Sequence, residues 1–169
     1  MAGEILVHKH LIIRAEAINP PMEVSHLTDW MHNFIDYINM KVLMGPYVVY
    51  HNVPGNRGIT GAAIIETSHI VMHVWDEPNP ALMQFDVYSC GEFDAEEICK
   101  KIKNDFDVTK IDYKFLDREN NLKDVSGGNF VYEKSSWEPH ILTKPPWHDL
   151  WYPLYITQVQ QLGWPLDFA

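Results

Sequence analysis

The stretch from Gly58 to Gly91 constrains the fold most, because strand-forming runs alternate there with short polar breaks. Gly61 to Ile65 and His69 to Trp75 are apolar runs of strand length, and the break between them falls at Glu66-Thr67-Ser68. After a proline-rich turn, Gln84 to Ser89 alternates apolar with polar side chains, as a half-exposed strand does. Short strands joined by tight turns favour a sheet that is mainly antiparallel.

Two segments outside this stretch carry apolar residues at helical spacing. The first helix is expected to be capped by Ser25 and to end near Met40. The second is expected to begin at Asp94, which forms a capping box with Glu97. The predicted buried stripes are Leu27, Trp30, Met31, Phe34 and Ile38 in the first helix, and Ile98, Cys99, Ile102 and Phe106 in the second.

Three more runs are typical of strands: Ile5 to Ala17, the residues around Tyr47 to Tyr50, and Val108 to Leu116. The order along the chain is therefore strand, helix, several strands, helix, strand. This order predicts an α+β fold, a two-layer sandwich in which helices cover one face of a mainly antiparallel sheet.

We expect a domain over residues 1–119 and a C-terminal extension over residues 120–169. Asparagine, serine and glycine are frequent from Asn120 to Gly128, which indicates a flexible connection. From Phe130 onward four tryptophans stand among five prolines, and so aromatic a segment is not disordered by composition. We therefore expect an extended Trp/Pro-rich C-terminal arm that packs on the domain or on a partner subunit.

The net charge of −10 argues against nucleic-acid and anionic-membrane partners, because both need a basic face. Glu4, Lys9, Arg14 and Glu16 interrupt the apolar residues near the N-terminus, so we expect neither a signal peptide nor a transmembrane segment. The two cysteines do not make a disulfide framework, and the expected setting is the reducing cytoplasm.

Ser68, with histidines and a cysteine nearby in the chain, is placed as a pyruvoyl enzyme needs its serine. In such an enzyme the serine hydroxyl attacks the preceding carbonyl and converts the peptide bond to an ester. A base then takes the serine α-proton, and β-elimination splits the chain and leaves a pyruvoyl group at the new N-terminus. That ketone forms a Schiff base with a substrate amine and accepts electrons on decarboxylation. The chemistry requires a strained serine, a base and a proton donor.

A series of clusters, in this order, resembles the short prokaryotic type of S-adenosylmethionine decarboxylase. The clusters are Gly58-Ile59-Thr60-Gly61, Ser68-His69, His73 with Trp75 and Glu77, and Asp86 with Cys90-Gly91. The match covers roughly residues 10–116, with spacing close to the family pattern. The resemblance implies a pyruvoyl-dependent enzyme that decarboxylates S-adenosylmethionine and so provides the aminopropyl donor for spermidine synthesis.

The resemblance also implies the roles of particular side chains. Ser68 matches the serine that becomes the pyruvoyl group when the chain cleaves itself between Thr67 and Ser68. His73 matches the histidine that acts as a base in processing, and Thr60 stands where the family has a serine near the processing site. Cys90 matches the cysteine that donates a proton during decarboxylation.

Glu77 matches the glutamate that binds the ribose hydroxyls of the substrate. Because the family's active sites lie at a homodimer interface, the resemblance implies a homodimer or a higher homo-oligomer. On a strand, His69 and His73 would point to one face as a metal pair, but no third ligand is evident, so no metal is expected. His69 is interpreted instead as a packed or hydrogen-bonded strand residue, and Cys99 as structural.

Two departures from the family pattern leave other functions open. Thr67 stands where the family has glutamate, which motivates an unprocessed member that binds a ligand or partner without catalysis. The aromatic residue that stacks on adenine would fall near Val53-Pro54, where the nearest rings are Tyr50 and His51. The other alternative is therefore the same pyruvoyl chemistry on arginine or ornithine.

Overall fold

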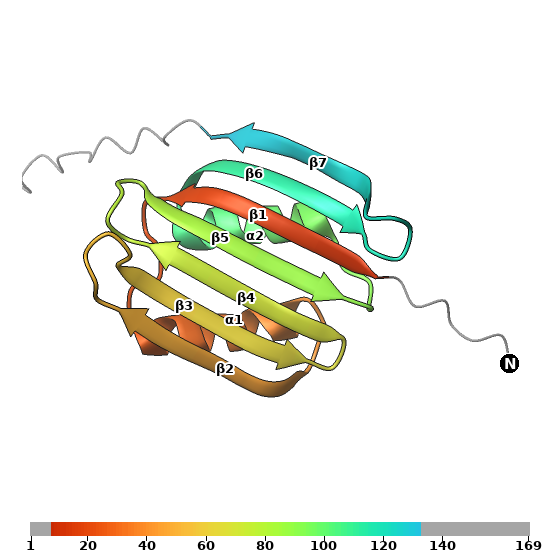
Figure 1. Cartoon of the computed structure of the whole chain (residues 1–169), viewed down its shortest axis with the longest axis horizontal. Helices are drawn as coiled ribbons and strands as arrows, with labels where there is room; N and C mark the ends of the chain where they lie inside the picture. Colours follow the sequence, from red (N-terminus) through yellow and green to blue (C-terminus); the bar gives the residue numbers. More distant parts are fainter. Residues whose placement is uncertain (1–7, 133–169) are drawn as a thin grey trace, which may run out of the picture. The chain divides into compact units, whose positions relative to one another are not determined.

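The computed structural model describes residues 8–132 of the 169-residue chain, and these form seven strands and two helices. Figure 1 traces the chain from red to blue. The elements are β1 (Lys9–Ala17), α1 (Val24–Tyr37), β2 (Val42–His51), β3 (Gly58–Ile65), β4 (Ser68–Trp75), β5 (Ala81–Ser89), α2 (Ala95–Phe106), β6 (Val108–Asp117) and β7 (Lys123–Val131). Neither of these helices is long and apolar enough to cross a membrane.

The strands form one sheet in the order β2-β3-β4-β5-β1-β6-β7, and every neighbouring pair runs antiparallel. Strands β2 to β5 follow one another directly, whereas β1, the first strand in the chain, lies between β5 and β6 (Figure 1). The first strand therefore joins the β2–β5 series to the β6–β7 pair. The predicted antiparallel sheet is confirmed.

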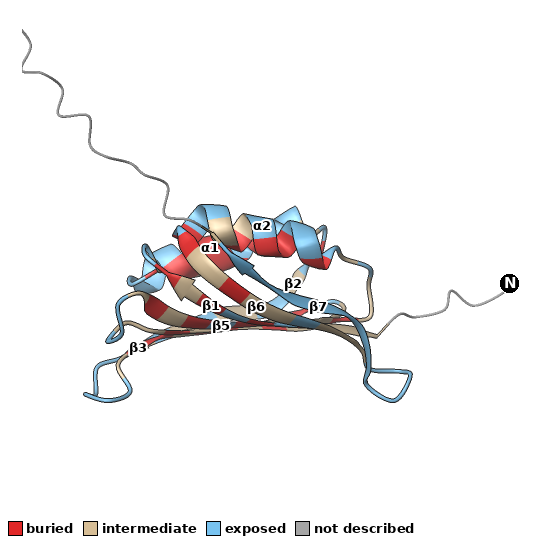
Figure 2. Ribbon diagram, turned by 90° about the horizontal axis from the view of Figure 1, so that it is seen from above, coloured by how far each residue is buried: buried red, intermediate tan, exposed pale blue. Residues whose placement is uncertain are grey.

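Both helices lie on the same side of the sheet, as Figure 2 shows. α1 packs against β2 and β3, and α2 packs against β6 and β1. The strands alternate accordingly: Leu11 and Ile13 are buried beneath the helices, whereas Ile12 and Arg14 are exposed on the opposite side. We call that side, which carries Ile12 and Arg14, the open face. The predicted fold class, a two-layer α+β sandwich, is confirmed.

Aromatic rings at the centre of the core join the two helices to the sheet. The Trp30 ring stacks on Phe34 with centroids 5.0 Å apart and lies 4.9 Å from the Phe106 ring of α2. Phe34 in turn meets Phe85 of β5 edge to face at 5.1 Å. The indole N–H of Trp30 donates to Asp105 at 2.8 Å, so its polar group is satisfied. Burying each ring contributes about 1.5–3 kcal/mol.

The apolar stripe predicted for α1 is buried apart from Ile38, which follows the helix and is partly buried, and Ile35 is an additional core residue. The predicted cap is wrong. The helix begins at Val24 with Glu23 as its N-cap, so Ser25 lies within the first turn. There its backbone is helical and cannot take the extended conformation of a cap.

The predicted N-cap and apolar stripe of α2 are confirmed, but the capping box is only half formed, because the Glu97 carboxylate accepts from Lys100. The Asp94 carboxylate accepts hydrogen bonds from the backbone N–H groups of Glu96 and Glu97 at 2.8 and 3.0 Å. Ile98, Cys99, Ile102 and Phe106 are all buried.

The flexible connection expected from Asn120 to Gly128 is wrong, because β7 occupies most of it and pairs with β6. A Cβ atom at Gly127 would lie 3.1 Å from the carbonyl oxygen of Tyr113, so this glycine allows the two backbones to approach closely. Residues 5–7 of the predicted first strand, and the C-terminal arm beyond residue 132, lie outside the described residues.

Candidate active site

Ser68 is the first residue of β4 and follows the two-residue turn that connects β3 to β4. Its φ is 147°, a backbone angle that residues with a side chain rarely adopt and that costs about 1–3 kcal/mol. In the other non-glycine residues of the described chain with positive φ, the angle lies between 48° and 58°, the ordinary left-handed region. Backbone strain therefore falls on the residue that follows the predicted cleavage bond.

The Ser68 hydroxyl lies beside the imidazole of the next residue. Ser68 Oγ is 3.2 Å from Nδ1 of His69. Consecutive side chains of a regular strand point to opposite faces, so this contact requires a break in the pleat, and the φ of Ser68 provides it. A serine hydroxyl and a potential base thus lie within hydrogen-bond distance where the backbone is strained.

The carbonyl group of Thr67, which the serine would attack, is held from the neighbouring strand. The backbone N–H of Cys90 donates to the Thr67 carbonyl oxygen at 3.0 Å. Cys90 directly follows β5, and Ser89 is paired with Ser68 in the sheet. The Ser89 hydroxyl, which is buried, accepts from the N–H of Gly91 at 2.8 Å and fixes this end of β5.

The two cysteines differ in environment. Cys90 is half-buried next to the Thr67–Ser68 bond, whereas Cys99 lies in the core on α2. Burial raises the pKa of the Cys99 thiol to about 12. Of the two cysteines, only Cys90 lies next to Ser68.

Thr60 and His73 form a second polar pair on the open face. They are directly opposite each other in β3 and β4, and Thr60 Oγ1 lies 2.9 Å from Nδ1 of His73. The two flanking glycines have packing reasons: a Cβ at Gly61 would lie 2.6 Å from the Met31 sulfur of α1, and one at Gly58 would collide with the β4 backbone. In the Gly58–Gly61 motif, the two glycines allow β3 to pack closely against α1 and β4, and Thr60 contacts His73.

The structure does not bring His73 to Ser68 within one chain. Both residues belong to β4 and are five positions apart, so about 16 Å of strand separates them at 3.3 Å per residue. Thr67, Ser68, His69 and Cys90 gather at one end of β4, which we call the Ser68 cluster. The Thr60–His73 pair lies near the other end.

Beyond the Thr60–His73 pair, residues that end β4 hold the loop between β2 and β3. The indole N–H of Trp75 donates to the Asn56 side chain at 2.9 Å. The Glu77 carboxylate accepts from the backbone N–H groups of Gly55 and Arg57 at 2.9 and 3.3 Å, and these bonds lower its pKa. Glu77, the predicted ribose contact, thus lies at the opposite end of β4 from the Ser68 cluster.

Asp76, to which the sequence pattern assigns no role, follows β4 and forms a partly buried ion pair with Arg57 of the same loop. Its side chain is only 3% exposed and accepts from Arg57 Nε and from the Tyr50 hydroxyl, each at 2.6 Å. Burial raises the pKa of the Asp76 carboxyl, but the hydrogen bonds from Tyr50 and Arg57 outweigh this and leave its pKa below the usual 3.8. The Tyr50 ring packs against the core and not over the open face.

A row of rings crosses the open face beside the Ser68 cluster. His69, Tyr88 and His10 are directly opposite one another in β4, β5 and β1. The His69 and Tyr88 rings meet edge to face at 5.5 Å, and His10 and Tyr88 are 5.7 Å apart. Burial lowers the pKa of His10, and nearby Arg118 adds to this, while Asp86 opposes it. These three rings could be predicted to lie side by side only from the register of β4, β5 and β1, and the sequence alone does not determine that register.

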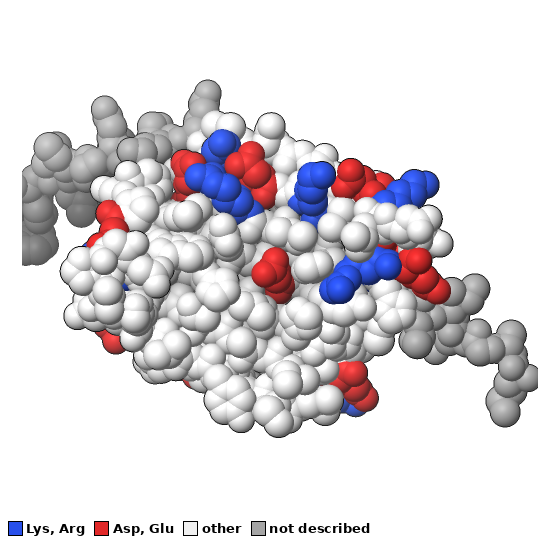
Figure 3. Space-filling view, in the orientation of Figure 1, with Lys and Arg blue, Asp and Glu red and all other residues white. Residues whose placement is uncertain are grey.

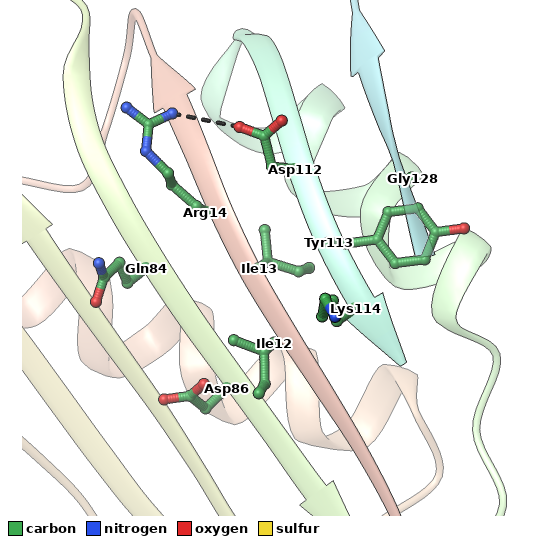
Figure 4. A pocket seen from close by; sticks show the side chains of 9 residues that line it. All are labelled: Ile12, Ile13, Arg14, Gln84, Asp86, Asp112, Tyr113, Lys114 and Gly128. Atoms are coloured by element: carbon green, nitrogen blue, oxygen red, sulfur yellow. Dashed lines mark hydrogen bonds and ion pairs between the residues drawn. The ribbon is translucent and has the colours of Figure 1, made fainter. Parts of the chain in front are cut away.

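A hollow of about 370 Å³ lies on the open face over β1, β5, β6 and β7 (Figure 4). Its lining is Ile12, Ile13, Arg14, Gln84, Asp86, Asp112, Tyr113, Lys114 and Gly128. Figure 4 shows Arg14 directed at Asp112, with an N–O distance of 3.5 Å. The hollow includes none of the predicted site residues, and charges of both signs line it. Among residues 8–132, no three His, Cys, Asp or Glu side chains gather to hold a metal ion.

The fold and site define a small α+β protein in which a strained serine lies beside an imidazole at the start of an inner strand, β4. The sequence model of the S-adenosylmethionine decarboxylase family matches residues 9–119. Relatives named S-adenosylmethionine decarboxylase proenzyme, from the Langeland and Okra strains of Clostridium botulinum, are 34% identical over 91 residues. That match covers 53% of this chain and 73% of each relative. The chain therefore belongs to the S-adenosylmethionine decarboxylase family.

Proposed function

We propose that this chain is a pyruvoyl-dependent S-adenosylmethionine decarboxylase that cleaves itself between Thr67 and Ser68. The observation that carries the proposal is the environment of that peptide bond: a strained φ at Ser68, and the N–H of Cys90 on the carbonyl oxygen of Thr67. The relatives' name, proenzyme, supports it. Threonine in place of the family's glutamate leaves the attacked group unchanged, because that carbonyl belongs to the backbone.

In the first step of the proposed processing, Ser68 Oγ attacks the Thr67 carbonyl carbon and an ester replaces the peptide bond. Negative charge develops on the Thr67 oxygen, to which the Cys90 N–H already donates. A fixed donor at such an oxygen is worth about 2.7–4 kcal/mol in other enzymes. Breaking the peptide bond also releases the constraint on the Ser68 backbone, which favours the ester.

The second step requires a base at the α-carbon of Ser68. Since the Thr60–His73 pair lies about 16 Å along β4 from Ser68, we propose that this pair comes from a second copy of the chain whose open face meets this one. Figure 3 shows that charged side chains are sparse over β2, β3 and β4 on this face. Exposed apolar residues there, which a homodimer would cover, include Tyr47 and Ile64.

The pyruvoyl group derived from Ser68 would supply the ketone that accepts electrons from the breaking carboxylate bond of the substrate. Cys90, half-buried beside Ser68, is proposed to donate the proton that completes the reaction. Glu77 is proposed to meet the ribose hydroxyls. Its carboxylate accepts two backbone hydrogen bonds, which leaves further lone pairs for a ligand.

One observation favours a second candidate, a pyruvoyl-dependent decarboxylase of arginine or ornithine. Tyr50, one of the two rings nearest in sequence to the adenine-stacking position, donates its hydroxyl to Asp76 and packs against the core. It is therefore not free to stack on an adenine from the open face. Trp75, whose ring centroid lies 5.8 Å from that of His73, is an aromatic residue next to the Thr60–His73 pair.

Two measurements on the purified full chain test the proposal. Intact mass spectrometry is expected to find fragments of residues 1–67 and 68–169, the second beginning with a pyruvoyl group, and Ser68→Ala is expected to stay whole. Release of labelled carbon dioxide is then measured separately with S-adenosylmethionine, arginine and ornithine, each labelled in the carboxyl carbon.

Release from S-adenosylmethionine alone supports the first candidate, and release only from arginine or ornithine supports the second. A chain that stays whole and releases no carbon dioxide would contradict both, and would leave the unprocessed ligand- or partner-binding protein. Lys101→Ala, a change on the helix side far from Ser68, is a control expected to behave as the unaltered chain does.

A further inference from the structure

We infer that His69 is the base that takes the Ser68 hydroxyl proton when the peptide bond is converted to an ester. The inference rests on the proposed self-cleavage and assigns its first step to a residue distinct from His73. Ser68 Oγ lies 3.2 Å from His69 Nδ1, within reach for proton transfer. His73, in contrast, lies about 16 Å along the same strand.

The contact depends on a distortion that the backbone maintains at a cost. In a regular strand the side chains of residues 68 and 69 would point to opposite faces of the sheet. The φ of 147° at Ser68 turns its side chain to the side of His69.

Neighbouring strands fix the imidazole in place. His69 is directly opposite Tyr88 of β5, and the two rings meet edge to face at 5.5 Å. Tyr88 is itself held, because its hydroxyl lies 3.1 Å from His8 Nδ1 and the Arg118 guanidinium stacks 4.1 Å from its ring centre. With its proton on Nε2, the His69 ring presents the Nδ1 lone pair to the serine.

The proton and the bonds balance without any further reactant. As the Oγ–C bond to Thr67 forms, the hydroxyl proton passes to His69 Nδ1, and the charge on the Thr67 oxygen is met by the Cys90 N–H. The imidazolium then returns the proton to the amide nitrogen of Ser68 as the bond from Thr67 to that nitrogen breaks. The product is an ester with a free amine on Ser68, and nothing is oxidised or reduced.

Trapping the ester with hydroxylamine tests this step separately from the elimination. The His73→Ala chain, in which elimination is blocked, is incubated with hydroxylamine, which splits an ester and not a peptide bond. We expect fragments ending at Thr67 and beginning with an intact Ser68, measured by intact mass. His69→Asn in the same background keeps a hydrogen-bond acceptor but not a base, and should split about 10²–10⁴-fold more slowly.

Two further variants guard against a structural explanation. His32→Ala in the His73→Ala background removes an exposed imidazole from α1 and should split as fast as His73→Ala alone. His69→Ala in that background vacates the space of the ring, and added imidazole should restore part of the splitting rate. Circular dichroism of each variant checks that the fold is retained.

The outcomes separate this inference from the proposed function. Splitting of the His69→Asn variant within about threefold of its background, or no response of His69→Ala to imidazole, would overturn the role of His69 while self-cleavage stands. If the unaltered chain remains whole and His73→Ala gives no hydroxylamine-sensitive bond, the proposed function fails and the inference fails with it.

Discussion

In the proposed self-cleavage, Ser68 combines a backbone angle typical of glycine with a side chain that glycine lacks. Its φ of 147° is typical of glycine, yet only a residue with a hydroxyl can attack the Thr67 carbonyl. The surrounding sheet maintains the strained angle, since Ser68 is paired with Ile65 on one side and with Ser89 on the other. Under the proposed function, the strain reflects the need for a hydroxyl at this position.

Removing the hydroxyl in two ways separates strain from chemistry. Ser68→Gly and Ser68→Ala both lack the nucleophile, so neither chain should cleave. Because the glycine relieves about 1–3 kcal/mol of backbone strain and costs roughly 0.5–1 kcal/mol in chain entropy, we expect Ser68→Gly to be more stable than Ser68→Ala by about 1 kcal/mol. Thermal or urea denaturation measures the difference, and an alanine variant of equal or greater stability would contradict the strain.

The resemblance predicts which residues form the site, but the sequence predicts few of the contacts between them. The resemblance identified Ser68, His73, Thr60 and Cys90, and the Thr60–His73 contact follows from strand register. The hydrogen bond between Ser68 and His69 could not be predicted, because the two-residue period of a strand places neighbours on opposite faces. Only the angle at Ser68, which depends on the tertiary structure, brings them together.

The end of β4 holds the loop between β2 and β3 through three consecutive side chains. Trp75, Asp76 and Glu77 each bond to a residue of that loop, and Asp76 is the most buried of them. Glu77, the proposed ribose contact, is one of these three residues. The shape of the loop and the position of Glu77 therefore depend on each other.

Acid should weaken the bonds that Asp76 makes with Tyr50 and Arg57. The pKa of Asp76 is lower in the folded chain than its usual 3.8, so its ionised form adds stability above that value and loses it as the pH falls through the folded pKa. We expect Asp76→Asn to lower the melting temperature at pH 7 and the difference to shrink below about pH 4. Thermal denaturation between pH 3 and pH 7 measures this. Glu92→Gln, at an exposed site, is the control, and an offset for Asp76→Asn that stays constant to pH 3 would contradict the expectation.

The helices and most strands could be predicted because apolar periodicity reflects which face is buried. That signal failed at β7, whose nine residues are all exposed and which therefore lacks an alternating pattern. Its glycines resemble a loop in composition, yet they pair with β6. The N-cap of α1 was also missed, since Glu23 makes no side-chain capping bond that a sequence motif would reveal.

The open face divides into two regions across the described sheet. Charged pairs lie toward β6 and β7, such as Lys114 with Asp124, whereas exposed Tyr47, Val49 and Ile64 lie over β2 and β3 (Figure 3). Ile64 is directly opposite His69, so the apolar region reaches the Ser68 cluster. A partner copy seated on this face would therefore exclude water from the site as well as complete it.

Mixed oligomers test whether the site is shared. Ser68→Ala and His73→Ala chains are expressed together; each alone lacks one half of every site. In a mixed dimer, the intact His73 of one copy faces the intact Ser68 of the other, so we expect His73→Ala chains to be cleaved only in the mixture. Ile64→Lys should give monomers by light scattering and abolish the rescue. Full cleavage of His73→Ala chains alone, or a monomeric unaltered protein that cleaves, would contradict a shared site.

The position of β1 determines what a cut between residues 67 and 68 does to the molecule. The first piece would contribute β1, β2 and β3, and the second β4 to β7 within the described range. In the sheet order, β1 lies between β5 and β6, both of which belong to the other piece, and β3 pairs with β4 across the cut. The two pieces therefore pair with each other at three places in the sheet: β3 with β4, β5 with β1, and β1 with β6. A cleaved chain would behave as one folding unit of two polypeptides that separate only when the whole sheet unfolds.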